Sequence, residues 1–305
     1  HMNRLNINNE MGMLKTVVLG IADDFGGPPN ESECYDPKSK EHVIKGTFPI
    51  EKDLRNELKH FYNILIKYNV EVLRPNSIEK LNQIFARDIA FVIDDKIIIS
   101  NTIEDRKREV NGINYILKSI QSESILKLSD NCRIEGGDVI VHDDYIFIGY
   151  SNEEDFKKFK VSRTNLHAVN NISDFFSSKK VVAFELNKSD LNAKENALHL
   201  DCCFQPIGKN MAIIYEGGFK NSNDIVFLNN LFGKENLINI SKDEMYNMNS
   251  NIFSISDNVI VSEKSFDRLN SILRKKGFKV EMIDFSEIAK MEGLLRCSTL
   301  PLNRL

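Results

Sequence analysis

Residues 89–99 have the sequence Ile-Ala-Phe-Val-Ile-Asp-Asp-Lys-Ile-Ile-Ile, with an apolar run on either side of a polar turn. Two short apolar runs separated in this way predict a β-hairpin with a tight connection. A stretch with helical periodicity follows, in which Val110, Ile113 and Ile116 fall on one apolar side. Residues 89–120 therefore predict a unit of two strands followed by a helix.

The same unit recurs three more times, and a fifth copy is divided between the ends of the chain. The later hairpins turn at residues 142–144, 208–210 and 257–258. The divided copy would pair a strand at residues 16–20 with one at residues 297–302 and so close a ring. We therefore expect an α/β fold in which ββαβ modules form a circular array.

A polar or nucleophilic residue stands at or near the start of each hairpin. The five are Asp88, Glu135, His199, Asn251 and Cys297. They are separated by 47, 64, 52 and 46 residues, which matches the period of the repeat. Because the hairpin starts of a circular array meet at one axis, we expect these residues to share one pocket.

Composition and charge narrow the function classes. The chain has 305 residues, 42% of them hydrophobic, and a formal net charge of −4, which predicts a sizeable core and no nucleic-acid or membrane-surface partner. No apolar run approaches the roughly 20 residues of a membrane-spanning helix. The five cysteines fit neither a disulfide framework nor a zinc motif. We expect a reduced, cytoplasmic protein, and the sequence leaves a homo-oligomer open.

Two segments fall outside the repeat. We expect residues 1–13 to be an N-terminal tag or extension, with His1 a cloning remnant before Met2, and residues 14–305 to form a single α/β domain. Residues 21–46 read as a long polar loop. A loop of this length inside a compact domain is typically a lid, a binding loop or a disordered segment.

The acidic residues near the hairpin starts are expected to be paired with a cation or a hydrogen-bond donor. Asp88, Glu135 and Asp201 precede apolar strands, where a buried, unpaired carboxylate is costly. Taken singly, they read as turn residues or members of buried ion pairs. Together with His199 they offer ligands for a hard metal, although no helical His or Cys-x-x-Cys spacing supports such a site. The third alternative is covalent catalysis on a cationic substrate, with Cys297 as the nucleophile.

Covalent catalysis accounts best for the residue types. Paired carboxylates hold a planar guanidinium group by bidentate hydrogen bonds. Its central carbon resists attack by water, whereas a thiolate is a stronger nucleophile, and cations such as protonated His199 and Arg296 favour the thiolate form of Cys297. His199 can then protonate the leaving amine and later deprotonate the incoming nucleophile. This chemistry needs no cofactor.

Five short motifs stand in a fixed order between residues 85 and 302. They are Arg87-Asp88, Glu135-Gly136-Gly137-Asp138, Ser162-Arg163-Thr164-Asn165, His199-Leu200-Asp201 and Gly293-Leu294-Leu295-Arg296-Cys297. In this order they resemble the guanidine-modifying superfamily, which includes arginine deiminases, dimethylarginine dimethylaminohydrolases, agmatine deiminases and amidinotransferases. The resemblance implies a five-bladed α/β propeller of ββαβ modules, the pentein fold.

The resemblance also implies a role for individual residues. Cys297 is the nucleophile, His199 is the general acid and base, and Glu135 helps to orient His199. Arg163 and Arg106 resemble arginines that grip the substrate carboxylate. The residues implied to contact the substrate are Asp88, Glu135, Asp138, Asp201, Arg106 and Arg163.

The sequence departs from the family pattern in two places. An acidic, lysine-rich insertion separates Ser151 from Ser162, which can displace Arg163. Cys202-Cys203 directly follows the His199 motif, and we interpret both as small buried strand residues. The Glu-Gly-Gly-Asp motif is closer to the deiminase pattern, so we expect hydrolysis of an arginine-like substrate to a ureido product. Transfer of the amidino group to an amine acceptor, and ligand binding without catalysis, stay open.

Overall fold

The computed structural model describes residues 4–305, and its strands form the predicted repeat. Within those residues there are five three-stranded sheets. Four of them follow one another along the chain: β3 (Ala90–Ile93), β4 (Lys96–Ile99) and β5 (Ile125–Lys127); β6 (Val139–His142), β7 (Tyr145–Tyr150) and β8 (Lys180–Glu185); β9 (Phe204–Ile207), β10 (Met211–Ile214) and β11 (Leu237–Asn239); β12 (Phe253–Ser254), β13 (Val259–Glu263) and β14 (Lys279–Ile283). In each, the first two strands form an antiparallel hairpin and the third lies parallel to the second.

The two ends of the chain together form the fifth sheet, as predicted. It consists of β15 (Thr299–Arg304), β1 (Leu14–Leu19) and β2 (Glu71–Leu73) in that order. β15 is antiparallel to β1, with Thr299 opposite Leu19, and all of its residues are buried. Because strand side chains alternate, Val17 and Leu19 of β1 pack into one core cluster and Val18 into another. The closing strand is thus part of the core.

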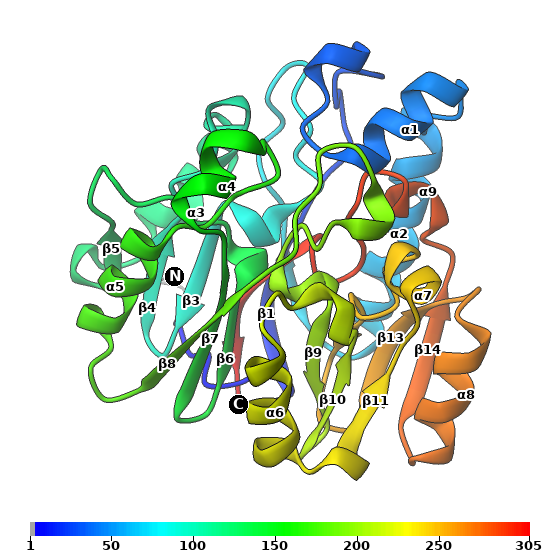
Figure 1. Ribbon diagram of the computed structural model, residues 1–305. Helices are drawn as coiled ribbons and strands as arrows, with labels where there is room; N and C mark the ends of the chain where they lie inside the picture. Colours follow the sequence, from blue (N-terminus) through cyan, green and yellow to red (C-terminus); the bar gives the residue numbers. More distant parts are fainter. Residues whose placement is uncertain (1–3) are drawn as a thin grey trace.

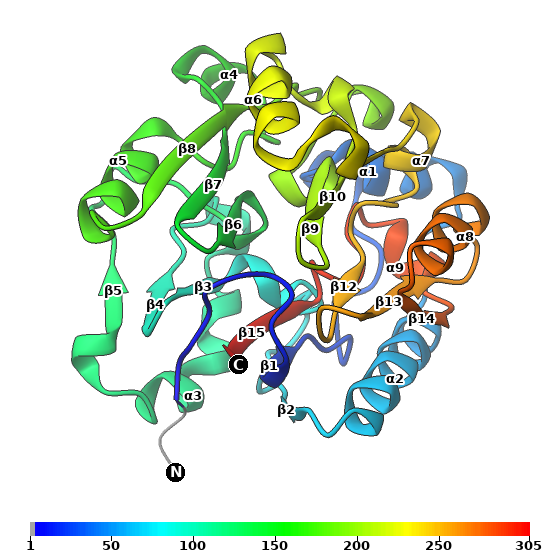
Figure 2. The same cartoon turned by 90° about the horizontal axis from the view of Figure 1, so that it is seen from below.

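The helices lie outside the sheets, and the first strand of each sheet lies toward a common centre (Figure 1, Figure 2). They are α1 (Pro37–Lys45), α2 (Glu51–Lys67), α3 (Asn114–Lys118), α4 (Glu153–Lys158), α5 (Leu166–Phe175), α6 (Ser222–Phe232), α7 (Lys242–Tyr246), α8 (Asp267–Lys275) and α9 (Ser286–Ala289). The predicted apolar face of α2 is confirmed, since Leu54, Leu58, Phe61 and Leu65 are each at most 1% exposed. Among the described residues, no helix combines the length and apolar character needed to cross a bilayer.

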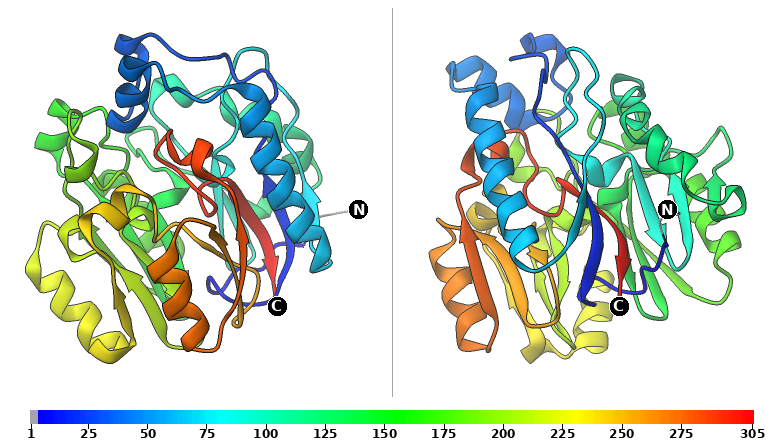
Figure 3. Two further views of the ribbon diagram at one scale, coloured as in Figure 1. Left: turned by 90° about the vertical axis from the view of Figure 1, so that its right-hand side faces the viewer. Right: turned by 180° about the vertical axis from the view of Figure 1, so that it is seen from behind.

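The segment expected as a loop at residues 21–46 contains a helix. α1 begins after Asp36, whose side chain accepts a hydrogen bond from the Ser39 backbone N–H at 2.7 Å, and Pro37 occupies its first position. It ends at Gly46, which adopts a φ of 70°. Figure 3 shows α1 at the end of the ring where β1 ends and β15 begins. The segment therefore covers that end of the ring.

The described part of residues 1–13, which we expected to be a tag or extension, packs against the sheets. Leu5 and Ile7 are buried in a core cluster. The backbone of Ile7 exchanges hydrogen bonds with that of Asp94, and the Asn6 N–H donates to the carbonyl of Leu302. Apolar residues in a polar segment gave no periodic signal, so their docking was not evident from the sequence. His1 and Met2 lie outside the described residues.

Candidate active site

The hairpin starts converge, as the repeat predicted. Asp88, Glu135, His199 and Cys297 are each at most 2% exposed. The His199 Nε2 atom lies 2.7 Å from Glu135 Oε1. The fifth marker, Asn251, accepts a hydrogen bond from the Cys297 backbone N–H at 3.0 Å. Residues from five different repeats therefore meet around one thiol.

The thiol of Cys297 lies beside a carboxylate and a second thiol. Its Sγ is 3.8 Å from Asp201 Oδ2, and Cys202 Sγ lies 3.7 Å from Asp201 Oδ1. Hydrogen bonding from Cys202 lowers the pKa of Cys297 and His199 adds to this, whereas burial and the charge of Asp201 oppose it. The net direction favours the thiolate, which is the nucleophilic form. Cys202 is buried as expected, but it also borders the nucleophile.

His199 is placed to give up a proton toward the cavity. Burial disfavours the imidazolium, but the Asp88 charge and the proximity of Cys297 and Glu135 outweigh it and raise the pKa of His199 well above its usual value. Nε2 is held by Glu135, whereas Nδ1 is 3.8 Å from Asp88 Oδ1 and has no hydrogen-bond partner within residues 4–305. A protonated Nδ1 is thus the free donor of the site.

Gly137 explains why the second motif contains consecutive glycines. Its backbone N–H donates to Asp88 Oδ1 at 2.9 Å. A Cβ at this position would lie 2.7 Å from His199 Nδ1 and 2.9 Å from the same aspartate oxygen. Any side chain would therefore separate the imidazole from the carboxylate.

One buried ion cluster lies behind His199. Arg106 binds both carboxylate oxygens of Glu109, at 2.9 and 3.0 Å, and its Nη1 also contacts Asp88 at 2.9 Å and Glu135 at 3.1 Å. Arg163 Nη1 donates to Glu135 Oε1 at 2.8 Å. The two arginines thus neutralise the protein's own carboxylates, whereas we expected them to grip a substrate carboxylate.

A second ion cluster lies beside Cys297. Arg296 Nη1 donates to Asp201 Oδ2 at 2.8 Å, and its Nε donates to Glu10 Oε1 at 2.7 Å. A further hydrogen bond of 2.8 Å reaches the carbonyl of Val139. Arg296 therefore neutralises Asp201 and is itself held by acids.

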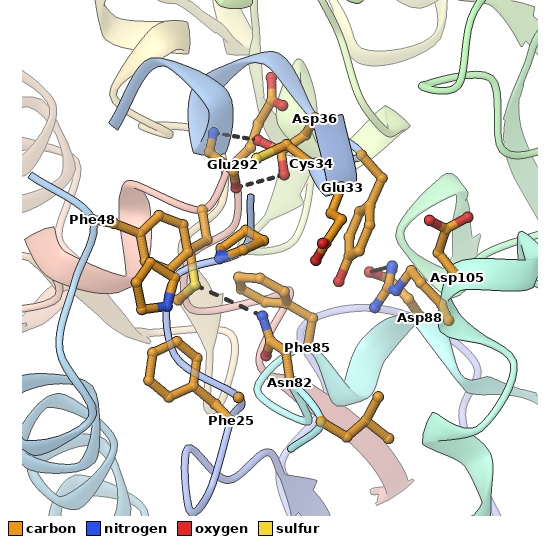
Figure 4. A pocket seen from close by; sticks show the side chains of 18 of the residues that line it. Phe25, Glu33, Cys34, Asp36, Phe48, Asn82, Phe85, Asp88, Asp105 and Glu292 are labelled. Atoms are coloured by element: carbon orange, nitrogen blue, oxygen red, sulfur yellow. Dashed lines mark hydrogen bonds and ion pairs between the residues drawn. The ribbon is translucent and has the colours of Figure 1, made fainter. Parts of the chain in front are cut away.

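The reacting residues open onto a cavity of about 380 Å³. Asp88, His199 and Cys297 line it together with Arg106 and Arg163. Glu135 and Asp201 stand directly behind this surface, in contact with His199 and Cys297 respectively. Figure 4 shows aromatic side chains on the opposite side of the cavity, and its far wall comes from residues 25–39 and from Met291 and Glu292.

Asp138 does not reach the cavity. Its carboxylate accepts hydrogen bonds from the Thr164 hydroxyl at 2.6 Å and from the Leu200 backbone N–H at 2.9 Å. These contacts tie the motif of Gly137 to the turn that carries His199. Asp138 thus positions neighbouring chain segments, and the structure places it apart from the other predicted substrate-binding residues.

Two overlapping groups of side chains have the spacing of a metal site. In the set His199, Asp201 and Cys202 and in the set Asp88, Glu135 and His199, one ligand atom per residue lies within 4.8 Å of the others. Glu135 and Asp201 are already paired with arginines. The raised pKa of His199 favours the imidazolium, which has no free lone pair to offer. The donor set fits an organic cation better than a metal ion.

Several acidic residues of the cavity and its ion clusters were not predicted from the sequence. Glu10 lies in the segment expected as an extension, Glu109 follows Arg106 without a motif, and Glu292 occupies an irregular loop. Asp36 carried a recognisable signal, because Asp-Pro before a helical stretch is typical of a helix start. The others depend on contacts between segments distant in sequence.

The sequence is similar to known proteins over most of its length. Residues 40–304 match the family model described as N,N dimethylarginine dimethylhydrolase, eukaryotic. An uncharacterized Bacillus subtilis protein, YkgA, is 31% identical over 273 residues, covering 83% of this chain and 87% of its own. The arginine deiminase of Streptococcus uberis is 25% identical over 205 residues, which are 58% of this chain and 48% of that enzyme, so the matched part is about half of it.

A solved structure matches along the whole length. SxtG, an amidinotransferase from Microseira wollei in the saxitoxin biosynthetic pathway, superposes with a TM-score of 0.77 over 98% of this chain and 97% of its own. The two sequences are 17% identical over that alignment. At this identity the match establishes a shared fold.

Proposed function

The chain belongs to the N,N-dimethylarginine dimethylhydrolase family of guanidine-modifying enzymes, and from this premise we propose that Cys297 attacks the guanidinium carbon of an arginine-like substrate, which is then hydrolysed to a ureido product. The observation that carries the proposal is the meeting of Cys297, His199 and Asp88 on one cavity. In this proposal the five sheets are the blades of an α/β propeller, and their inner ends supply the catalytic groups.

Substrate binding would use the carboxylates next to the thiol. Asp88 lines the cavity, and Asp201 lies 3.8 Å from Cys297 Sγ. A guanidinium group offers planar N–H donors to carboxylates on either side of its carbon. Its positive charge beside Cys297 would further favour the thiolate. Arg163 and Arg106 would keep Glu135 and Asp88 fixed, since both arginines are already paired with these carboxylates.

The first step would form the covalent intermediate. The Cys297 thiolate attacks the guanidinium carbon and a C–S bond forms. The carbon–nitrogen bond to the leaving group then breaks as His199 transfers its Nδ1 proton to that nitrogen, releasing ammonia or an amine and leaving an amidino-thioether. The hydrogen bond from His199 Nε2 to Glu135 fixes the orientation of the imidazole during the transfer.

The second step would regenerate the Cys297 thiolate. Neutral His199 accepts a proton from water at Nδ1 as the water oxygen attacks the amidino carbon. The C–S bond breaks, the electron pair returns to Cys297 as its thiolate, and the carbon leaves as a ureido group once its hydroxyl proton passes to solvent. Glu135 and Asp88 stabilise the imidazolium that forms.

The proposal is tested with a panel of guanidino compounds, with and without amine acceptors. Intact-mass measurement after rapid quenching is expected to detect an adduct on wild-type protein and none on the Cys297→Ala variant. Release of ammonia or alkylamine with a ureido product supports hydrolysis. Formation of a new guanidino compound only when an acceptor is present means transfer, and turnover without an adduct that is abolished by chelators overturns the proposal.

A further inference from the structure

A pair of carboxyl groups lies at the end of the cavity away from Asp88. Asp36 precedes α1 and Glu292 follows α9, and the two side chains stand close together in Figure 4. Both line the cavity, yet they are only 7% and 5% exposed. No residue of the proposed reaction depends on them.

Glu292 has an oxygen without a partner. Its Oε1 accepts a hydrogen bond from Asn196 Nδ2 at 3.2 Å, whereas its buried Oε2 has none within residues 4–305. The two oxygens of Asp36 accept from the backbone N–H and hydroxyl of Ser39. Lys38, near the start of α1, is a cation whose charge acts on both acids, but its ammonium donates to the carbonyl of Tyr246 at 2.7 Å and forms no salt bridge with either within the described residues, so two carboxyl groups face a single lysine. No salt bridge within 4.0 Å neutralises either carboxyl group in the described chain.

Two buried carboxyl groups in contact cannot both carry an uncompensated charge. They either share a proton or bind a cation. Burial, followed by the charge of Asp36, raises the pKa of Glu292 well above its usual value. A primary ammonium is a suitable cation, because its three N–H donors can reach oxygens of both carboxyl groups at once.

The rest of the cavity fits a cationic substrate with an apolar middle. Phe25, Phe48 and Phe85 line it and offer surface to a methylene chain. The two arginines on its wall, Arg106 and Arg163, are already paired with carboxylates. Among its described lining residues, the buried end near Glu292 thus has spare negative charge.

We propose that Asp36 and Glu292 bind a primary ammonium group at the far end of the guanidino substrate. The preferred substrate class is then a guanidinoalkylamine, with its guanidinium at Cys297 and its amine at this carboxyl pair. A carboxylate on the same end is disfavoured because it would face two acids. This assignment rests on the proposed function and adds the class of substrate to it.

The test compares three compounds of equal chain length. They are 4-guanidinobutylamine, n-butylguanidine and 4-guanidinobutyrate, assayed for kcat/KM on wild type, Glu292→Gln, Asp36→Asn and Glu33→Gln. Asparagine still caps α1, and Glu33 is an exposed acid of the same cavity that serves as the charge control. Wild type is expected to prefer the amine over butylguanidine at least about tenfold, and the butyrate least.

The variants decide whether the preference comes from this pair. Glu292→Gln and Asp36→Asn are expected to lose most of the preference for the amine while turnover of butylguanidine stays within about twofold. Glu33→Gln is expected to keep the preference. Equal turnover of the amine and butylguanidine by wild type, or an unchanged preference in Glu292→Gln, overturns the assignment.

A binding measurement separates this assignment from the chemistry. Calorimetry of 4-guanidinobutylamine with Cys297→Ala is expected to show binding that weakens at least about tenfold when Glu292→Gln is added. If no compound is turned over or forms an adduct but this difference in binding persists, the proposed reaction fails and the ammonium site stands. If turnover and adducts are found without the difference, the ammonium site alone fails.

Discussion

The two walls of the cavity differ in how their buried carboxyl groups are paired. On the inner wall, which we define as Asp88, His199 and Cys297 with the acids behind them, the carboxylates are paired with arginines, as in the pairing of Asp201 with Arg296. On the outer wall, formed by residues 25–39 and Glu292, Asp36 and Glu292 accept N–H hydrogen bonds, but neither has a salt bridge within the described residues. The carboxylate charge of the inner wall is therefore balanced by arginines of the protein, whereas the carboxyl pair of the outer wall can accept a cation.

The walls also differ in how the chain builds them. The inner wall is fixed by backbone hydrogen bonds between repeats, such as that from the Arg87 N–H to the Cys297 carbonyl at 3.1 Å. The outer wall comes from an insertion between β1 and β2 and from an irregular turn, where Glu292 adopts a φ of 60°. In our proposal the repeat positions the reacting groups, and the segment between β1 and β2 determines which substrate is bound.

The largest expected effect, on stability, comes from removing β15, the strand that follows Cys297 in the chain. Deletion of residues 299–305 removes β15, whose six residues are all buried against β1 and the neighbouring sheet. We expect loss of the cooperative thermal transition, because a whole buried strand is removed and the net stability of a domain is only about 5–15 kcal/mol. Deletion of Leu305 alone, which is 71% exposed, is the control. A truncated protein that melts like wild type would show that ring closure is dispensable.

Substitution of Cys297 separates the chemistry of the inner wall from its architecture. Its backbone N–H and carbonyl are both hydrogen-bonded, to Asn251 and Arg87, and these bonds do not involve the side chain. Cys297→Ala is expected to lower turnover of guanidino compounds at least about 1,000-fold while the melting temperature changes little. Assays of activity and thermal unfolding on one preparation check this. Residual turnover near the wild-type rate would remove Cys297 from the mechanism.

The same contrast explains what could be predicted from the sequence. The inner wall was predictable because apolar hairpins mark each repeat, and His199 and Cys297 stand at matching places in it. The partners of Arg106 were not predictable from the sequence. Several acids lie near Arg106 in the fold, and only the structure shows that it pairs with Glu109. The residues of the outer wall do not follow the spacing of the repeat. Asp36 was visible as a helix cap, but its contact with Glu292 joins segments 256 residues apart in the sequence (292 − 36).

The two walls are expected to respond to pH with opposite signs, beginning with the inner wall. Burial alone would raise the pKa of Glu10, but the charges of Arg296 and Arg87 outweigh it and lower the value from 4.5 to about 2. The folded state then binds fewer protons than the unfolded chain, so this stabilisation is present above pH 4.5 and is lost toward pH 2. The shift corresponds to about 3 kcal/mol.

Urea unfolding of wild type and Glu10→Gln between pH 3 and pH 7 tests this expectation. Wild type should lose about 2 kcal/mol more stability between pH 7 and pH 3 than the variant, because the rest of the stabilisation is lost only below pH 3. Glu31→Gln, at an exposed acid, controls for the general effect of charge. Parallel pH curves for wild type and Glu10→Gln would mean that the pairing with Arg296 adds no net stability.

On the outer wall, the raised pKa of Glu292 has the reverse consequence. The folded state holds a proton that the unfolded chain releases above its ordinary value of 4.5, so stability falls as pH rises toward the folded pKa. Glu292→Gln removes the charge and gives Asp36 an N–H donor. We expect this variant to be more stable than wild type by about 1 kcal/mol at pH 8. A less stable variant would indicate a structural role for the carboxylate and weaken the contrast between the walls.

The smallest effect concerns two adjacent cysteines with different neighbours. Cys202 contacts the nucleophile and contributes the largest lowering of the pKa of Cys297, whereas the Cys203 thiol hydrogen-bonds to the carbonyl of Leu200. Cys202→Ala is therefore expected to raise the pKa of Cys297, so that alkylation by iodoacetamide at pH 7 slows a few-fold and its pH profile moves to higher pH. Cys203→Ala is the matched control, with an unchanged profile. Equal profiles for both variants would place the tuning of the thiol in His199 alone and leave Cys202 as a packing residue.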